Sequence, residues 1–178
     1  MKIVLVGYMG SGKSTIGKLL AEKLDTGFDD LDTRIENALK ADITQIFKDK
    51  GEIYFRKIEH QFLVEVLETA HNLVLATGGG TPCYSGNMSA MLENADAVIY
   101  LKISIPQLIE RLYREKAERP LIAHLEQSEL PEFVGKHLFE RNAYYSMAHH
   151  TVNCDGKSPE EIVTEIEQLL ILEDIIVP

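Results

Sequence analysis

Residues 2–17, KIVLVGYMGSGKSTIG, join an apolar run to a glycine-rich loop and then to the start of an amphipathic segment. Residues 7–14 match the pattern G-x-x-x-x-G-K-[ST], in which backbone N–H groups point at phosphate oxygens. Lys13 is expected to reach the β and γ phosphates of a nucleotide such as ATP, and Ser14 to ligate Mg²⁺. The apolar strand before the loop and the helix after it are the context that this mechanism needs. The residues predicted to bind the nucleotide here are Gly10, Ser11, Gly12, Lys13, Ser14 and Thr15.

Apolar runs of strand length recur along the chain, and the segments between them have helical periodicity. Strands that alternate with amphipathic helices predict a parallel sheet covered on both faces, and therefore a three-layer α/β fold. We expect a single domain over residues 1–178. Residues 158–161, SPEE, predict a capping box at the start of the last helix. The predicted strands are residues 2–6, 27–29, 73–77, 97–101 and 151–154.

The composition limits the partners and the location of the chain. Its formal net charge of −10 argues against nucleic acid, because nucleic-acid binding needs a basic surface, and favours a small ligand. Cys83 and Cys154 have no C-x-x-C spacing, so we expect free thiols, with neither a disulfide framework nor a zinc site. No apolar stretch approaches the roughly 18 residues that span a bilayer, so we expect no membrane partner and a cytoplasmic location.

Two aspartates follow the weak second strand. In residues 28–32, FDDLD, Asp30 and Asp32 are expected to project from the same side of an extended segment. The carboxyl ends of strands face the ligand crevice in open α/β sheets, which would place both side chains near the nucleotide. We predict that Asp30 orients water on Mg²⁺, and that Asp32 bonds an acceptor hydroxyl and takes its proton. A solvated acidic turn is the alternative that this pair alone leaves open.

Three successive glycines, Gly78, Gly79 and Gly80, directly follow the third strand. A turn needs at most one glycine, so this run predicts backbone that lies close to a ligand, with a permissive loop as the alternative. Arg56 lies on a predicted helix with apolar neighbours, and Arg141 lies far along the chain. Together they are predicted to clamp a carboxylate, for which the planar guanidinium is well suited.

Arg119 begins a polar segment that runs to about residue 127 and fits a mobile lid better than a helix. We predict a lid at about residues 114–127, in which Arg119 closes on the transferring phosphoryl group and neutralises its charge. A P-loop also serves motors and switches. The acidic charge argues against motors that act on nucleic acid, and the sequence has no guanine-reading NKxD-like stretch. A kinase that acts on a small molecule is therefore the leading class.

In this order, the motifs resemble those of the shikimate kinases, within the nucleoside-monophosphate-kinase-like group of P-loop kinases. The resemblance covers nearly the whole chain. It implies transfer of the γ-phosphoryl group of ATP to the 3-hydroxyl of shikimate, in the biosynthesis of chorismate and the aromatic amino acids. It also implies a five-stranded parallel sheet in the order 2-3-1-4-5 and a closing lid. The motifs are the P-loop, Asp30-x-Asp32, Phe55-Arg56-x-x-Glu59, Ala76-Thr77-Gly78-Gly79-Gly80, Arg119-Pro120-Leu121 and Glu140-Arg141.

The resemblance further implies roles for single residues. Lys13, Asp32 and Arg119 would be catalytic, with Asp32 as the base, and a substrate-binding segment would cover about residues 32–60. The adenine of ATP would stack between Arg111 and Pro159. A related kinase for a substrate such as gluconate and a noncatalytic nucleotide-binding module are the alternatives; we expect a monomer, with a weak homo-oligomer as the alternative. The residues expected around shikimate are Asp32, Arg56, Gly78, Gly79, Gly80 and Arg141, with Phe47, Phe55, Glu59 and Leu121 nearby.

Overall fold

A five-stranded parallel sheet forms the centre of the computed structural model, which describes residues 1–116 and 120–177. The strand order is β2-β3-β1-β4-β5, which confirms the predicted order 2-3-1-4-5. In the middle of the sheet, Ile3 of β1 lies opposite Val74 on one side and Ala97 on the other. The strands are β1 (Lys2–Val6), β2 (Gly27–Asp30), β3 (Leu73–Ala76), β4 (Ala97–Lys102) and β5 (His150–Asn153).

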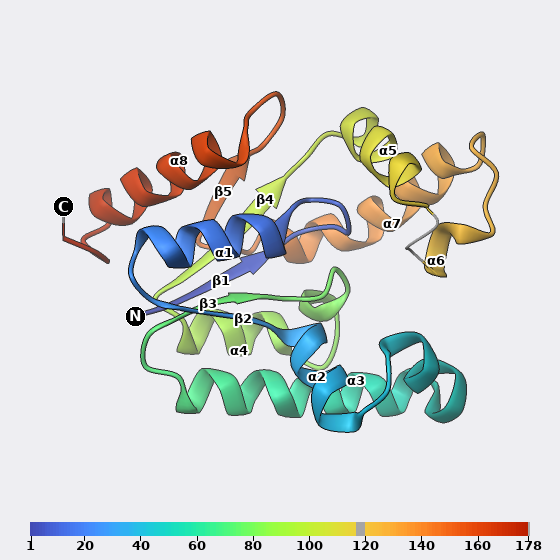
Figure 1. The fold of residues 1–178 in the computed structure, drawn as a ribbon, viewed down its shortest axis with the longest axis horizontal. Coiled ribbons are helices and arrows are strands. Elements are labelled where there is room, and N and C mark those ends of the chain that lie inside the picture. The colour runs from blue at the N-terminus through green and yellow to red at the C-terminus, as the bar shows by residue number, and fades with distance from the viewer. Residues whose placement is uncertain (117–119, 178) are drawn as a thin grey trace.

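Helices cover both faces of this sheet, as predicted for a three-layer α/β fold (Figure 1). On one face α1 packs against α8, and on the other α3 packs against α4. The helices α5 and α6 lie beyond the carboxyl ends of the strands, and α7 returns from there toward the sheet. The helices are α1 (Lys13–Lys23), α2 (Leu31–Leu39), α3 (Ile43–Thr69), α4 (Asn87–Asn94), α5 (Ile105–Arg114), α6 (Pro120–Ala123), α7 (Leu130–Tyr145) and α8 (Pro159–Leu172), with a short 3-10 helix, η1 (Thr81–Cys83).

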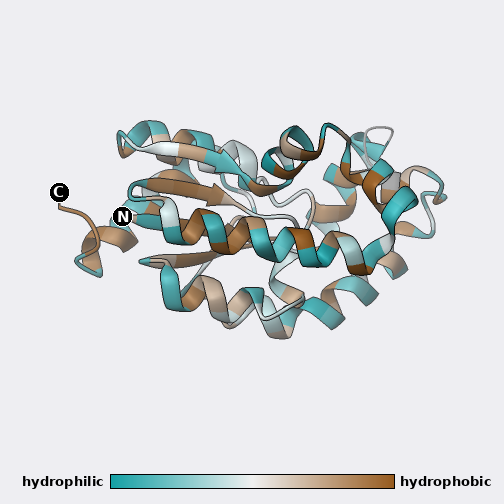
Figure 2. Cartoon of the chain, turned by 90° about the horizontal axis from the view of Figure 1, so that it is seen from below, coloured by the Kyte–Doolittle hydropathy of each residue, from teal (hydrophilic) through white to brown (hydrophobic). Residues whose placement is uncertain are grey.

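The core lies between the sheet and the two helix layers. Residues 3–6 of β1 are fully buried, because a central parallel strand has helices on both sides and no face left for solvent. Figure 2 shows the central strands in brown, between helices on which teal and brown alternate. Ile16 and Leu20 of α1 are buried against this sheet, as expected for the amphipathic segment that follows the P-loop.

The predicted capping box at the start of α8 is confirmed. The Ser158 hydroxyl accepts from the backbone N–H of Glu161, and the Glu161 carboxylate accepts from the backbone N–H of Ser158. Both cysteines are free thiols, with Cys83 half-buried and Cys154 buried. Among the described residues, no helix combines the length and the apolarity needed to cross a membrane.

The segment predicted to be a lid is partly helical, which the sequence pattern did not predict. Helix α6 occupies Pro120–Ala123, and Ile122 within it is fully buried. Burial of this apolar side chain, together with Leu125 packed against the core, gives the segment a structured base despite its polar neighbours. Arg119, the predicted lid arginine, lies outside the described residues.

Helix α3 is bent at Gly51, whose φ of 82° and ψ of 169° are not helical. The helix changes direction at this bend. The ring of Phe47, before the bend, lies 4.5 Å from the ring of Phe55, after it. Both rings line a cavity that Asp32, in the first turn of α2, also lines. The bend therefore builds one wall of a cavity at the functional end of the sheet.

Candidate active site

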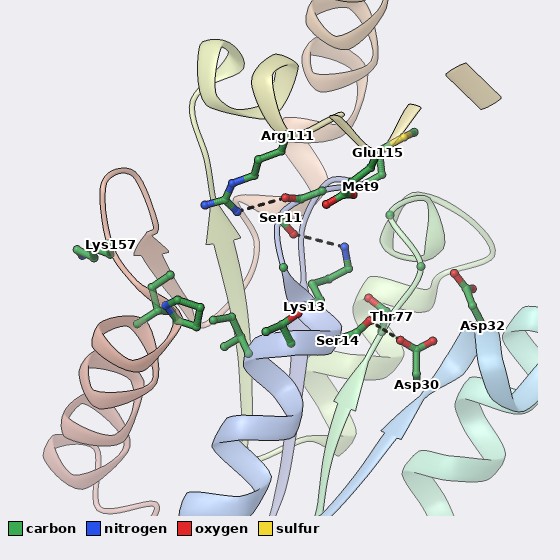
Figure 3. Close-up of a pocket in the computed structure, with 18 residues that line it drawn as sticks. Met9, Ser11, Lys13, Ser14, Asp30, Asp32, Thr77, Arg111, Glu115 and Lys157 are labelled. Atoms are coloured by element: carbon green, nitrogen blue, oxygen red, sulfur yellow. Dashed lines mark hydrogen bonds between the residues drawn. The ribbon is translucent and has the colours of Figure 1, made fainter. Parts of the chain in front are cut away.

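The P-loop lines a cavity of about 500 Å³ at the carboxyl ends of the strands, here called the P-loop cavity (Figure 3). Gly12, with a φ of +88°, precedes α1 in a conformation that glycine adopts without strain, so the amino end of α1 faces the cavity. Every predicted nucleotide-binding residue within the described part of the chain lines this cavity. These residues are Gly10, Ser11, Gly12, Lys13, Ser14, Thr15, Arg111 and Pro159.

Lys13 is held inside the loop rather than extended into solvent. Its ammonium group donates to the carbonyl oxygens of Gly7 at 2.8 Å and Tyr8 at 3.0 Å, and the residue is 8% exposed. The loop therefore places one positive charge beside backbone N–H groups at a helix amino end, which is a strong site for phosphate.

Two cationic side chains flank the loop from different elements (Figure 3). Arg111 of α5 donates from Nη1 to the carbonyl oxygen of Gly10 at 3.3 Å. Lys157, in the loop between β5 and α8, lines the same cavity and forms an ion pair with Glu165. Sequence reasoning named Arg111 but not Lys157, although Lys157 lies two residues before Pro159.

Ser14 and Asp30, the two residues predicted to serve a Mg²⁺ site, are hydrogen-bonded to each other. The Ser14 hydroxyl donates to Oδ2 of Asp30 at 2.7 Å, at the edge of the P-loop cavity. Hydroxyl and carboxylate oxygens are the hard ligands that Mg²⁺ prefers, so the donor set fits this ion. Within residues 1–116 and 120–177, no three His, Cys, Asp or Glu side chains are grouped to hold a metal. A bound Mg²⁺ would therefore complete its coordination with water and nucleotide oxygens.

Asp32 does not lie on an extended segment with Asp30, and that expectation is wrong. Asp30 ends β2 and caps α2, because its carboxylate accepts from the backbone N–H of Thr33 at 3.2 Å. The helix begins at Leu31, and Asp32 lies in its first turn. The two carboxylates nevertheless face the same cavity (Figure 3).

At neutral pH the carboxyl group of Asp32 is present in both its charged and its neutral form. Its pKa is raised from the ordinary 3.8 to about 7, mainly by burial and also by the nearby charges of Asp30 and Glu59, against the opposing charge of Lys13. A carboxyl group with a pKa near neutrality, in a cleft, is typical of a proton-transfer site.

A second cavity, of about 280 Å³, adjoins the first and is here called the arginine cavity. Met9, Asp32, Gly78 and Gly79 line both cavities, so Asp32 lies where they meet. Apolar side chains and two arginines form the rest of its walls. They are Ile43, Phe47, Phe55, Arg56, Leu121 and Arg141, together with Glu59 and Gly80.

Each of the three successive glycines allows a different close approach. A Cβ atom on Gly78 would lie 2.8 Å from Oδ1 of Asp32, and one on Gly80 would lie 2.8 Å from Nη2 of Arg56. A Cβ atom on Gly79 would lie 3.1 Å from the backbone nitrogen of Met9 in the P-loop. The loop is therefore close-packed against the site residues, and side chains at these three positions would clash with them. The glycines are needed for this close approach and not only for a flexible turn.

Arg56 is held tightly by charge and by aromatic rings. Its Nη1 donates to Oε2 of Glu59 at 2.9 Å, and Glu59 is 1% exposed. Its guanidinium carbon lies 4.0 Å from the ring centre of Tyr84, with the rings of Phe47 and Phe55 also nearby. Such contacts restrict the guanidinium to one orientation.

Arg141, on α7, also lines the arginine cavity, but its contacts differ from those of Arg56. Its guanidinium carbon lies 5.6 Å from the ring centre of Tyr8, and no carboxylate of the described residues lies within ion-pair distance of it. Because Glu59 offsets the charge of Arg56, Arg141 contributes most of the net positive charge of the arginine cavity. This asymmetry between the two arginines was not visible in the sequence.

Tyr145 lines neither cavity but supports the glycine loop that does, and sequence reasoning missed it. Its side chain is fully buried, and its hydroxyl donates to the carbonyl oxygen of Gly79 at 2.5 Å. Burial raises the pKa of this hydroxyl, which keeps it a neutral donor. The available signal was its spacing, because it lies four residues after Arg141 and thus on the same face of a helix.

The comparisons with known proteins agree with this geometry. A family model described as shikimate kinase matches residues 9–171. A shikimate kinase of Flavobacterium psychrophilum is 47% identical over 169 residues, which cover 95% of this chain and 98% of that protein. The crystal structure of shikimate kinase from Bacteroides thetaiotaomicron matches with a TM-score of 0.90 at 36% identity, and covers 96% of this chain and 98% of its own.

A second solved structure, shikimate kinase from Acinetobacter baumannii in complex with shikimate, matches with a TM-score of 0.88 at 34% identity. It covers 98% of this chain and 95% of its own. The likeness extends over sequence and structure alike, and over nearly the whole chain. The chain therefore belongs to the shikimate kinase family.

Proposed function

We propose that the chain transfers the γ-phosphoryl group of ATP to the 3-hydroxyl of shikimate. The observation that carries this proposal is the position of Asp32, which lines both the P-loop cavity and the arginine cavity. A phosphoryl donor in the first cavity and a carboxylate-bearing alcohol in the second would meet beside this side chain. Phosphoryl transfer depends mainly on such positioning and on stabilisation of charge.

In the proposed reaction, Asp32 accepts the proton of the 3-hydroxyl as its oxygen forms a bond to the γ phosphorus. The bond between the γ phosphorus and its bridging oxygen breaks, and ADP leaves. A pKa of about 7 lets Asp32 be ionised in a large fraction of molecules at neutral pH and still hold a proton after transfer.

The nucleotide end of the reaction would use the P-loop residues. Lys13 would neutralise the developing charge on the β and γ phosphates, and Arg119 would do the same from the lid. Ser14 and Asp30 would hold Mg²⁺, which when bound supplies positive charge to the phosphate oxygens. Adenine would stack between Arg111 and Pro159, which line the P-loop cavity.

The acceptor end would use the two arginines. Shikimate is a carboxylate with three hydroxyls, so a cationic group at one end and a carboxylate at the other match its chemistry. Arg141, with no carboxylate partner among the described residues, would attract the substrate carboxylate, and Arg56 would orient it. The proposed reaction would run in the cytoplasm, where ATP is supplied, and the expected monomer stays a prediction.

A coupled assay of ADP release tests the proposal. We expect ADP release that depends on both shikimate and Mg²⁺, and no comparable rate with gluconate in place of shikimate. The variant Asp32→Asn keeps the shape of the side chain but removes its basicity, so turnover should fall by about 100-fold or more. Shikimate-independent ADP release, or a preference for gluconate, would reject the assigned substrate. A rise only in the KM for shikimate would make Asp32 a positioning residue instead of the base.

A further inference from the structure

Behind the arginine cavity, three polar side chains are almost completely buried. Glu59 is 1% exposed, and Thr81 and Asn87 are each 0% exposed. Burial of polar groups costs free energy unless each is hydrogen-bonded, so a cluster of this kind is retained only where its bonds are made. All three side chains are paired in this structure.

The bonds between them converge on the carboxylate of Glu59. Thr81 Oγ1 donates to Oε1 of Glu59 at 2.6 Å, and Oε2 of the same carboxylate accepts from Arg56 Nη1 at 2.9 Å. Asn87 Nδ2 donates to the backbone carbonyl oxygen of Thr81 at 2.8 Å. The two oxygens of Glu59 therefore face different partners, and its carboxylate has one orientation.

His60 extends this series of hydrogen-bonded side chains beyond Asn87. Its Nδ1 lies 2.7 Å from Oδ1 of Asn87. Because an amide oxygen only accepts, Nδ1 is the donor, and the bond keeps the Asn87 amide turned with its nitrogen toward Thr81. The series thus links α3, which carries Glu59 and His60, with η1 and the start of α4.

We propose that Thr81 and Asn87 are positioning residues that set the affinity for shikimate through Glu59 and Arg56. The proposal rests on the proposed function, since its main readout is shikimate binding. Thr81 directly follows Gly80, whose missing side chain leaves room for Nη2 of Arg56. The same residue therefore holds the Glu59 carboxylate and anchors the loop against which the guanidinium lies.

The expected effect is on shikimate binding and not on ATP binding. Thr81→Val keeps the shape of the side chain and removes its donor, which leaves Oε1 of Glu59 buried without a bond. The carboxylate then gains freedom to rotate, and Arg56 loses its single orientation. We expect the dissociation constant for shikimate to rise on the order of 10-fold, because a lost hydrogen bond to a charged group has this magnitude. The KM for ATP should stay within about 2-fold, because Thr81 does not line the P-loop cavity.

The chain offers a matched control and a rescue. Thr26→Val makes the same chemical change where the hydroxyl is buried without a hydrogen-bond partner, ahead of β2 and at the opposite end of the sheet from the cavities. We expect it to leave the shikimate affinity unchanged. Thr81→Ser restores the donor and should recover most of the affinity. Asn87→Ala, which frees the carbonyl of Thr81, should weaken binding in the same direction as Thr81→Val.

Two measurements decide the outcome. Calorimetric titration gives the shikimate dissociation constant of each variant, and ¹H–¹⁵N NMR of the Arg56 guanidinium reports its orientation without any ligand. A guanidinium signal that is sharp in the wild type and exchange-broadened in Thr81→Val supports the proposal. Unchanged affinity and an unchanged signal in a folded Thr81→Val, even with a lower melting temperature, would overturn it. If the wild type itself does not bind shikimate, the proposed function fails, and the NMR comparison still tests the positioning role.

Discussion

Asp32 should lower the stability of the protein in its unliganded form, and the size of this effect follows from its burial. The pKa of this carboxyl group is about 7 in the folded chain against an ordinary value of 3.8. A difference of about 3 pH units corresponds to about 4 kcal/mol of folding free energy. Because the side chain is only partly buried, solvent screening reduces this figure, and we expect about 2 to 4 kcal/mol.

The sign of the effect depends on pH. Below about pH 4 the group is protonated in both the folded and the unfolded chain, and it has no cost. As the pH rises from about 4 to about 7, the unfolded chain releases the proton while the folded chain retains it, so the folded state loses stability relative to the unfolded state. Asp32→Asn cannot ionise, and its free energy of unfolding should exceed that of the wild type increasingly over this interval.

Urea unfolding at half-unit steps from pH 4 to pH 8, without nucleotide or Mg²⁺, measures this difference directly. Asp49→Asn, at an exposed aspartate on α3, serves as the control for loss of one negative charge. Subtracting its effect isolates the part that comes from the site. A difference between Asp32→Asn and the wild type that stays constant from pH 4 to pH 8 would refute the assigned environment of this carboxylate.

Three further predictions concern the groups around the substrates. Lys13→Ala should abolish phosphoryl transfer while the circular dichroism spectrum and the cooperative melting transition remain; unchanged turnover would remove Lys13 from the site. Arg56→Lys and Arg141→Lys keep the charge but lose the planar two-pronged geometry, so each should raise the calorimetric dissociation constant of shikimate by about 10- to 100-fold and leave that of ATP nearly constant. Wild-type shikimate affinity in both variants would reject the carboxylate clamp. Tyr145→Phe leaves the carbonyl of Gly79 without its buried donor and should lower the free energy of unfolding by about 1 to 2 kcal/mol; an unchanged urea midpoint would show that this bond is not stabilising.

The parts of the molecule that depend on contiguous residues could be predicted from the sequence. The P-loop, the alternation of strands and helices and the capping box at Ser158 each need only neighbouring side chains and their spacing. The sheet order came from the resemblance to a family and not from periodicity, because strand pairing joins residues far apart in the chain. The turn of helix at α6 was missed because a polar segment can still be ordered by one buried side chain, Ile122.

The arrangement of the site was decided only by the tertiary structure. The sequence placed Asp32 on an extended segment, but the cap formed by Asp30 starts a helix and turns Asp32 toward the junction of the two cavities. Likewise, nothing in the residues near Arg56 and Arg141 shows that one is offset by a buried carboxylate and the other is not. The physical reason is that parallel strands bring their carboxyl ends together at one edge, so side chains separated by tens of residues become neighbours. Burial there then sets their charges, orientations and pKa values, and burial is a property of the folded chain.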